Sequence, residues 1–139
     1  MNILFVCRHN RFRSRFAELY LNKINKNSNL KTKSAGIFLG AWPLDKLEVK
    51  IAKKFGVKLR GKPKPISTKI LRWVDLIILI TNDINDPENL FNYGKHNNKI
   101  IQWKIKDNDG NSEENIKNIL NQVAKETKKL NQKLLNQNV

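Results

Sequence analysis

The sequence predicts an α/β fold: a three-layer sandwich in which a four-stranded parallel sheet carries helices on both faces, in a single domain spanning residues 1–139. Three observations lead to this prediction. Short apolar runs, each long enough for one strand, alternate with segments in which apolar residues recur at helical spacing. The apolar runs lack the alternation of a half-exposed strand, so they are typical of strands buried on both faces. No repeat and no long linker divides the chain, and buried strands that alternate with helices form a covered parallel sheet.

The first half of the chain contains two predicted strands, each followed by a predicted helix. Residues 3–6 are a compact apolar run, and apolar residues then recur at helical spacing over 16–24. The second strand is expected over 30–35 and ends at a glycine. Apolar residues over 44–55 make an amphipathic helix that begins after Pro43 and stops at the next glycine.

The second half begins with a loop and continues with two more strands. Two prolines within 61–65 deny the backbone both donors and helical freedom, so this stretch is a loop. Ser67 is expected to cap a short helix before the third strand, 76–80, and the fourth strand follows at 99–103. The last helix begins near Ser112. Its apolar stripe consists of Ile116, Ile119, Leu120, Val123, Leu130 and Leu134.

The chain is strongly basic, with 27 Lys and Arg against 12 Asp and Glu and a net charge of +15. Such a charge attracts phosphates, acidic proteins and nucleic acids. The lysines are spread over the whole chain, and no nucleic-acid-binding motif accompanies them. A solvated basic surface is therefore favoured, and a nucleic-acid partner is the less favoured alternative.

Cysteine usage and hydropathy limit the class of protein. One cysteine excludes an internal disulfide, a CxxC redox pair and a cysteine-rich zinc site. No apolar run approaches the roughly 18 residues of a membrane span, and the run at 3–6 is too short for a signal-peptide core. We expect a cytoplasmic protein without a membrane partner, and the oligomeric state stays open.

The junction between the first strand and the first helix carries the residues best suited to chemistry. Open parallel sheets bind ligands at the carboxyl ends of their strands. Here Cys7 and Arg13 are separated by five residues, and Ser14 follows. A loop of this length that closes onto a helix N-terminus can turn its N–H groups inward as an anion nest. The loop consists of Arg8, His9, Asn10, Arg11 and Phe12.

Each of the flanking residues suits a role in phosphate chemistry. A cysteine at a helix N-terminus has a lowered pKa, so Cys7 would be a nucleophilic thiolate. The planar fork of Arg13 would hold two phosphoryl oxygens. Ser14 would donate to the sulfur, and Asn10 would tie the loop's own backbone groups together and tolerate an unusual backbone angle. The alternative is that Cys7, at the end of an apolar strand, is a small core residue.

This pattern resembles the beginning of a low-molecular-weight protein-tyrosine phosphatase. The similarity extends over most of the chain at modest strength. It rests on Ile3–Cys7, Arg13-Ser14, Ala17-Glu18, Ser34-Ala35-Gly36, Pro43, Asp45, residues 52–57 and residues 64–78. The resemblance implies the four-stranded parallel sheet, a phosphocysteine intermediate at Cys7, and hydrolysis of phosphate monoesters, most of all protein phosphotyrosine. It implies no metal and no cofactor, and its partner is a phosphorylated protein or a small phosphomonoester.

Three positions depart from the family's loop, which commonly has Gly in place of His9, Cys in place of Phe12 and Pro in place of Arg15. His9 questions whether the loop closes in the usual way. Phe12 removes the neighbouring thiol, so an oxidised Cys7 would need an external thiol for its recovery. Arg8, Arg11 and Arg15 are expected to add positive charge at the loop's open end and to favour a multiply anionic substrate.

The resemblance also implies a general acid, an Asp usually followed by Pro, in a loop after the fourth strand. Asp107 is the favoured candidate, although Asn108 replaces the Pro, and Asp109 is the alternative. Asp86-Pro87 is interpreted as the start of a helix.

An aromatic residue could stack against the substrate's leaving group. Trp42 is the first candidate for this pocket wall, although ordinary packing is its favoured explanation, and Trp103 and Tyr93 follow. Three other functions stay open. They are reduction of arsenate with an external thiol, hydrolysis of phosphoarginine or a small phosphometabolite, and binding of phosphate or nucleic acid without catalysis.

Overall fold

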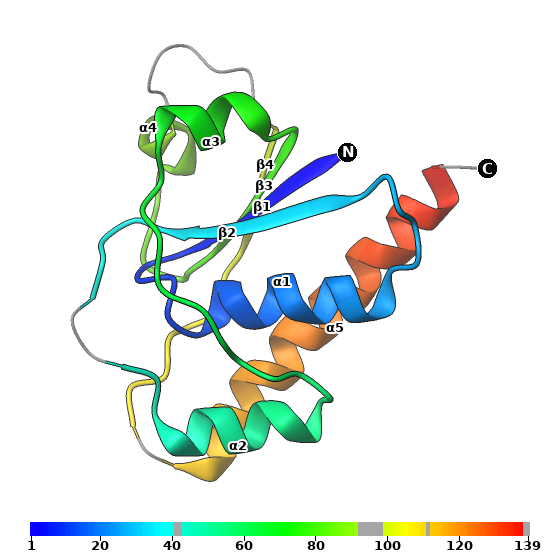
Figure 1. Ribbon diagram of the computed structural model, residues 1–139. Helices are drawn as coiled ribbons and strands as arrows, with labels where there is room; N and C mark the ends of the chain where they lie inside the picture. Colours follow the sequence, from blue (N-terminus) through cyan, green and yellow to red (C-terminus); the bar gives the residue numbers. More distant parts are fainter. Residues whose placement is uncertain (41–42, 92–98, 111, 138–139) are drawn as a thin grey trace.

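The computed structural model describes residues 1–40, 43–91, 99–110 and 112–137. The elements run in the order β1 (Asn2–Cys7), α1 (Arg13–Ile24), β2 (Lys31–Gly36), α2 (Lys46–Lys54), α3 (Thr68–Trp73), β3 (Leu76–Ile80), α4 (Pro87–Leu90), β4 (Lys99–Trp103) and α5 (Glu113–Gln137). The strands form one parallel sheet in the order β2-β1-β3-β4. Helices α1, α2 and α5 cover one face, and α3 and α4 cover the other (Figure 1). The predicted fold class is confirmed.

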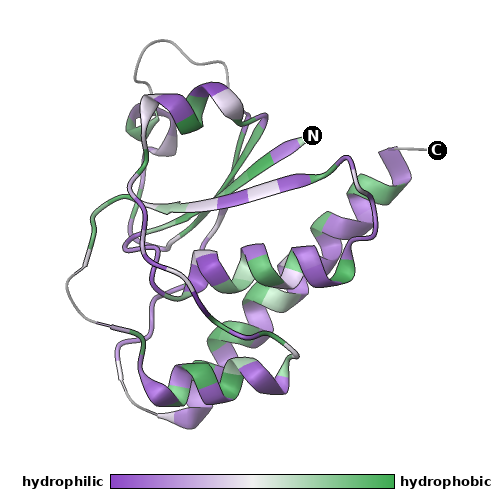
Figure 2. Ribbon diagram, in the orientation of Figure 1, coloured by the Kyte–Doolittle hydropathy of each residue, from purple (hydrophilic) through white to green (hydrophobic). Residues whose placement is uncertain are grey.

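Alternate residues of β1 enter the two separate halves of the core. Ile3, Phe5 and Cys7 pack with α1, α2 and α5, whereas Leu4 and Val6 pack against the helices of the opposite face. All five side chains are almost completely buried. Figure 2 shows hydrophobic residues in the central strands, whereas β2 at the edge of the sheet is largely hydrophilic and the helices alternate between the two kinds. The expectation of a strand buried on both faces is confirmed.

Helix α1 begins at Arg13, three residues before the first apolar residue of its predicted span, and the other helices begin within two residues of their predicted starts. Helix α2 begins at Lys46, later than the apolar pattern suggests, because Asp45 caps it: its side chain accepts from Leu47 N at 2.8 Å. Ser67 caps α3 as expected, and Asp86 precedes the short helix α4 that begins at Pro87. Within the described ranges, no helix is both long and apolar enough to span a bilayer.

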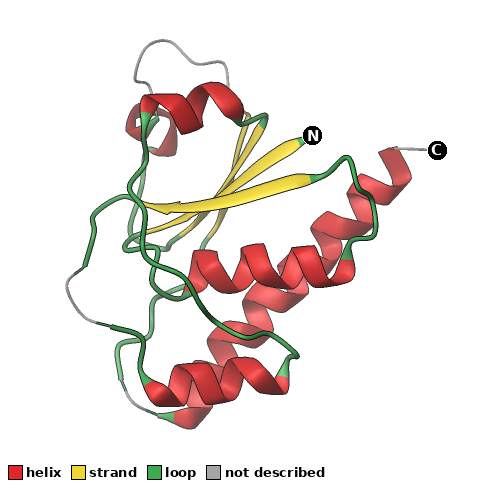
Figure 3. Cartoon of the chain, in the orientation of Figure 1, coloured by secondary structure: helices red, strands yellow, loops and turns green. Residues whose placement is uncertain are grey.

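The parallel sheet brings the loops that follow its strands to one edge. Cys7 at the end of β1 is paired in register with Gly36 at the end of β2, and Ile80 at the end of β3 is paired with Trp103 of β4. The loops that leave these strand ends are visible in Figure 3. Residues 8–12, 37–40 and 104–110 therefore lie at the same edge of the sheet.

Candidate active site

The loop between Cys7 and Arg13 closes tightly against the segment that follows β2. Ile37 N donates to the carbonyl oxygen of Cys7 at 3.1 Å, and Phe38 N donates to that of Arg8 at 2.7 Å. Gly36 is essential to this approach, since a Cβ there would lie 2.8 Å from the carbonyl carbon of His9. The loop is thus shaped by backbone contacts with β2.

The sulfur of Cys7 lies next to a hydroxyl group. Ser14, in the first turn of α1, has its Oγ atom 3.0 Å from the Cys7 Sγ atom. The Nδ2 group of Asn10 donates to the same Oγ at 2.8 Å. Since Ser14 accepts this bond from Asn10, its own proton is available to the sulfur. The predicted contact between Ser14 and Cys7 is present.

Asn10 holds the loop in its turn. Its φ angle is +53°, in the left-handed region that Asn tolerates better than most residues, as predicted. Its Oδ1 atom accepts from the backbone N–H of Lys64 at 2.9 Å. The expectation that Asn10 would tie the loop's own backbone groups together is therefore wrong. Its side chain bonds instead to Ser14 and to the proline-rich segment around Lys64.

Arg13 reaches from the start of α1 to the loop after β4. Its Nη1 group donates to the carbonyl oxygen of Ile105 at 2.8 Å, and its Nη2 atom lies 3.5 Å from Oδ2 of Asp107. The side chain is only 2% exposed, and its buried Nε group has no partner among the described residues. A buried donor without a partner costs about 1–3 kcal/mol. An oxyanion held in the loop is a suitable acceptor for it.

The two acidic residues of the late loop have different surroundings. Asp107 lies beside Arg13, its side chain is 35% exposed, and its Oδ1 atom accepts from Asn108 N at 2.8 Å. Asp109 is exposed and accepts from Asn115, at the start of α5, at 3.4 Å. The structure therefore brings Asp107, and not Asp109, to Arg13 at the end of the loop.

Arg11 of the loop and Arg15 of α1 are buried and do not supply charge at the loop's open end. Arg11 forms a two-pronged ion pair with the fully buried Glu48, with 2.9 Å between Nη2 and Oε2. Arg15 donates to the carbonyl oxygens of Asn10 at 2.9 Å and of Arg60 at 2.7 Å. The prediction of added positive charge is wrong for Arg11 and Arg15, because both guanidinium groups are used in structural contacts.

The pKa values of these two arginines shift in opposite directions. Burial alone would lower the pKa of Arg11, but the hydrogen bond and the charge of Glu48 outweigh burial and raise it. Arg15 has no comparable partner, and burial lowers its pKa.

Arg8 remains at the rim of the site, where its charge is largely offset. Its Nη1 atom donates to Oδ2 of Asp83 at 2.6 Å, and both side chains are about half exposed. The hydroxyl group of Thr81, together with Arg8, lowers the pKa of Asp83, so the pair stays charged. The guanidinium carbon of Arg8 also lies 5.8 Å from the ring centre of Phe38.

The remaining predicted residues fall into three groups. His9 does not prevent closure: its Nδ1 atom lies 2.7 Å from the Phe38 carbonyl oxygen, so Nδ1 carries the proton, and its ring packs beside Gly40. The side chain of Phe12 is buried in the core, so Phe12 can reach a ligand only through its backbone. Trp42 and Tyr93 lie outside the described residues. Trp103 is wrong as a pocket wall, because it is buried against Phe5.

Glu48 was not anticipated from the sequence as a member of this region. It lies on α2, yet it contacts the loop of residues 8–12 through Arg11. It also contacts the loop of residues 104–110, where Asn108 lies 3.1 Å away. A signal was present: Glu48 lies four residues after Leu44 and three before Ile51, on the apolar side of the helix. A carboxylate at such a position requires buried partners.

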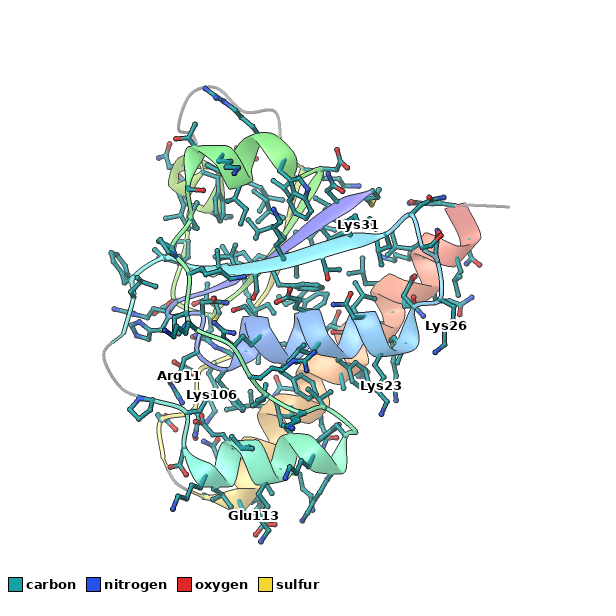
Figure 4. All side chains as sticks on the ribbon, viewed as in Figure 1. Arg11, Lys23, Lys26, Lys31, Lys106 and Glu113 are labelled. Carbon is teal, nitrogen blue, oxygen red and sulfur yellow. The ribbon has the colours of Figure 1, made fainter. Side chains whose placement is uncertain are left out.

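Most of the labelled lysines lie away from the site. Figure 4 shows Arg11 and Lys106 at the end of the molecule where the loops meet, and Lys23, Lys26 and Lys31 toward the other end. Among the described residues, no cluster of His, Cys, Asp and Glu is suited to hold a metal ion. Arg13 is the buried cation best suited to bind an anion in the loop, because its Nε group has no hydrogen-bond partner in the part of the chain that the structure describes.

Known proteins share this fold. The family model described as low molecular weight phosphotyrosine protein phosphatase matches residues 2–139. A low molecular weight phosphotyrosine phosphatase from Vibrio cholerae O395 is 17% identical with a TM-score of 0.86, covering 100% of this chain and 99% of its own. The YwlE arginine phosphatase from Geobacillus stearothermophilus is 19% identical with a TM-score of 0.83, covering 98% and 94%.

An arsenate reductase from Archaeoglobus fulgidus is 25% identical with a TM-score of 0.72, covering 93% of this chain and 98% of its own. No curated protein sequence matches the chain. These structures thus belong to proteins named for different activities and share a common fold.

Proposed function

Because the chain belongs to the low molecular weight phosphotyrosine protein phosphatase family, we propose that it hydrolyses phosphate monoesters, above all protein phosphotyrosine, through a phosphocysteine on Cys7. One observation carries the proposal: the buried Nε group of Arg13 has no partner among the described residues, and Arg13 ends the same loop that begins at Cys7, whose sulfur lies 3.0 Å from a hydroxyl. A cationic donor without an acceptor beside a nucleophile is suited to a phosphoryl group.

In the first step the sulfur of Cys7 attacks phosphorus in line with the ester oxygen. A P–S bond forms, the P–O ester bond breaks, and Asp107 gives a proton to the departing phenoxide. Arg13 and the amides of residues 8–12 stabilise the equatorial oxygens. The 3.5 Å contact between Arg13 and Asp107 supports this assignment, since it sets the acid beside the bound phosphoryl group.

In the second step water attacks phosphorus, and the P–S bond breaks. The Asp107 carboxylate, now deprotonated, accepts the proton from this water, and inorganic phosphate is released. The Ser14 hydroxyl stabilises the departing sulfur by donating to it. None of these steps calls for a metal or a cofactor. An enzyme that depends on one free thiol suits the reducing cytoplasm, where we place it.

The Asp107→Asn variant tests the acid and the substrate class together. We expect it to lower kcat/KM for a phosphotyrosine peptide by about 10²–10⁴-fold, because Asn cannot transfer the proton. Asp109→Asn is the matched control and should stay within about threefold of the wild type, since Asp109 contacts only the start of α5 among the described residues. Release of phosphate under initial-rate conditions measures both.

Two results would contradict this assignment. One is a greater loss in Asp109→Asn than in Asp107→Asn. The other is wild-type cleavage of a phosphoarginine peptide, or thiol-dependent arsenate reduction, by a protein that leaves phosphotyrosine untouched.

A further inference from the structure

A buried carboxylate outside the reacting centre joins three segments of the chain. Glu48 lies in the first turn of α2 and is completely buried. Its Oε1 atom accepts from Arg11 Nη1 and from the backbone N–H of Asp45 at 2.9 Å. Its Oε2 atom accepts from Arg11 Nη2 at 2.9 Å and from Asn108 Nδ2 at 3.1 Å. A carboxylate has about four acceptor sites, so all of them are in use.

Two of these partners are close neighbours of residues in the proposed mechanism. Arg11 belongs to the loop of residues 8–12, which is proposed to bind the phosphoryl group and is called the phosphate loop here. Arg11 precedes Arg13 by two residues. Asn108 directly follows Asp107 and donates from its backbone N–H to the Asp107 Oδ1 atom at 2.8 Å. A continuous series of hydrogen bonds therefore runs from the phosphate loop through Glu48 to the carboxylate of Asp107.

Asn108 is itself held on its other side. Its Oδ1 atom accepts from Asn115 Nδ2, at the start of α5, at 2.9 Å. The Asn108 side chain thus has both of its polar atoms engaged, one with α2 and one with α5. With Asn108 fixed in this way, the backbone N–H that bonds to the Asp107 Oδ1 atom has a defined direction. The other oxygen of Asp107, Oδ2, then faces Arg13.

We propose that Glu48 is a positioning residue for the general acid: through Asn108 it holds Asp107 in place relative to the phosphate loop, to which Arg11 ties it. This inference rests on the proposed function. Glu48 touches neither the sulfur nor Arg13, so it acts through its partners. Its loss should weaken protonation of the leaving oxygen more than attack by sulfur. The rate penalty should therefore grow as the leaving group becomes a poorer one.

The test compares kcat/KM for p-nitrophenyl phosphate, which has a good leaving group, with kcat/KM for phenyl phosphate, which has a poor one. Glu48→Gln keeps the size of the side chain but points an NH₂ group at donors. We expect a loss of about tenfold for p-nitrophenyl phosphate and of about a hundredfold for phenyl phosphate. Glu126→Gln removes one carboxylate from the distant surface of α5 and should change neither rate.

Asn108→Ala supplies the second variant, because it removes the side-chain bond from residue 108 to Glu48 and leaves the Arg11–Glu48 pair intact. It should show the same unequal losses even if Glu48→Gln fails to fold. Equal losses on both substrates, or none, in Asn108→Ala would overturn the inference. Asp107→Asn, measured alongside, separates the two proposals. Suppose that Asn108→Ala shows no unequal losses. If Asp107→Asn shows none either, the proposed function fails. If Asp107→Asn does lose more rate on phenyl phosphate, only the role of Glu48 fails.

Discussion

Replacing Cys7 by Ser is expected to abolish turnover of phosphotyrosine peptides while the protein stays folded. The hydroxyl of Ser is a far weaker nucleophile than a thiolate and a poorer leaving group in the second step. We expect kcat/KM to fall by more than about 10⁴-fold, which corresponds to about 5.5 kcal/mol of transition-state stabilisation. Initial rates of phosphate release measure the loss.

Anion binding should survive in the same variant. The Ser side chain is slightly smaller than Cys, and the Arg13 guanidinium with its unpartnered Nε group is unchanged. Inorganic phosphate should therefore still raise the Tm of Cys7→Ser, because a ligand that binds only the folded state stabilises it. Turnover that persists in the variant would show that another residue is the nucleophile.

Replacing Arg13 by Lys is expected to be nearly as damaging, although the charge is kept. Nη1 of Arg13 is bound to the Ile105 carbonyl while Nε remains available, so one planar group spans a structural contact and the anion site. The single ammonium of Lys cannot do both. We expect kcat/KM to fall by about 10²–10³-fold, the loss typical when a transition-state donor is removed.

The matched control is Arg72→Lys, at the exposed end of α3. It makes the same chemical change away from the site and should leave kcat/KM and the effect of phosphate on Tm at wild-type values. Arg13→Lys should lower kcat/KM and should also lose the rise in Tm that phosphate causes. An Arg13→Lys variant with wild-type kcat/KM would show that the guanidinium fork is not what binds the phosphoryl group.

The fold could be predicted because its elements are encoded locally. The strands β1 and β3 are continuous apolar runs, and the prolines at 63 and 65 exclude regular structure from the segment before α3. The start of α2 was misplaced because the apolar pattern includes Leu44. The structure instead begins the helix at Lys46, directly after Asp45, and the capping box that Asp45 forms with Glu48 defines the first turn.

The contacts of the site were predictable only where a short spacing determines them. Cys7, Ser14 and Asn10 lie within eight residues, and a loop that closes onto a helix leaves them few arrangements. The role of Asp107 as the general acid is implied only by the family resemblance. Asp107 lies 94 residues after Arg13, and spacing carries no information over such a length.

The arginines show where the sequence was insufficient. Charge alone suggested that Arg11 and Arg15 face the ligand, but the direction of a side chain depends on partners that are distant in sequence. For Arg11 that partner is Glu48, and for Arg15 it includes the carbonyl oxygen of Arg60. Such pairings are set by how α2 and the segment before α3 pack against the loop, which no local pattern encodes.

The mechanism depends most on the covalent bond between phosphorus and the sulfur of Cys7. Rapid alkaline quenching of the Asp107→Asn variant during turnover of p-nitrophenyl phosphate, whose leaving group needs the least protonation, followed by proteolysis and mass spectrometry, detects this bond directly. We expect one phosphoryl group on the peptide that contains Cys7, forming before steady state and disappearing as substrate is exhausted. Continued release of phosphate with Cys7 unmodified at every time point would contradict the mechanism.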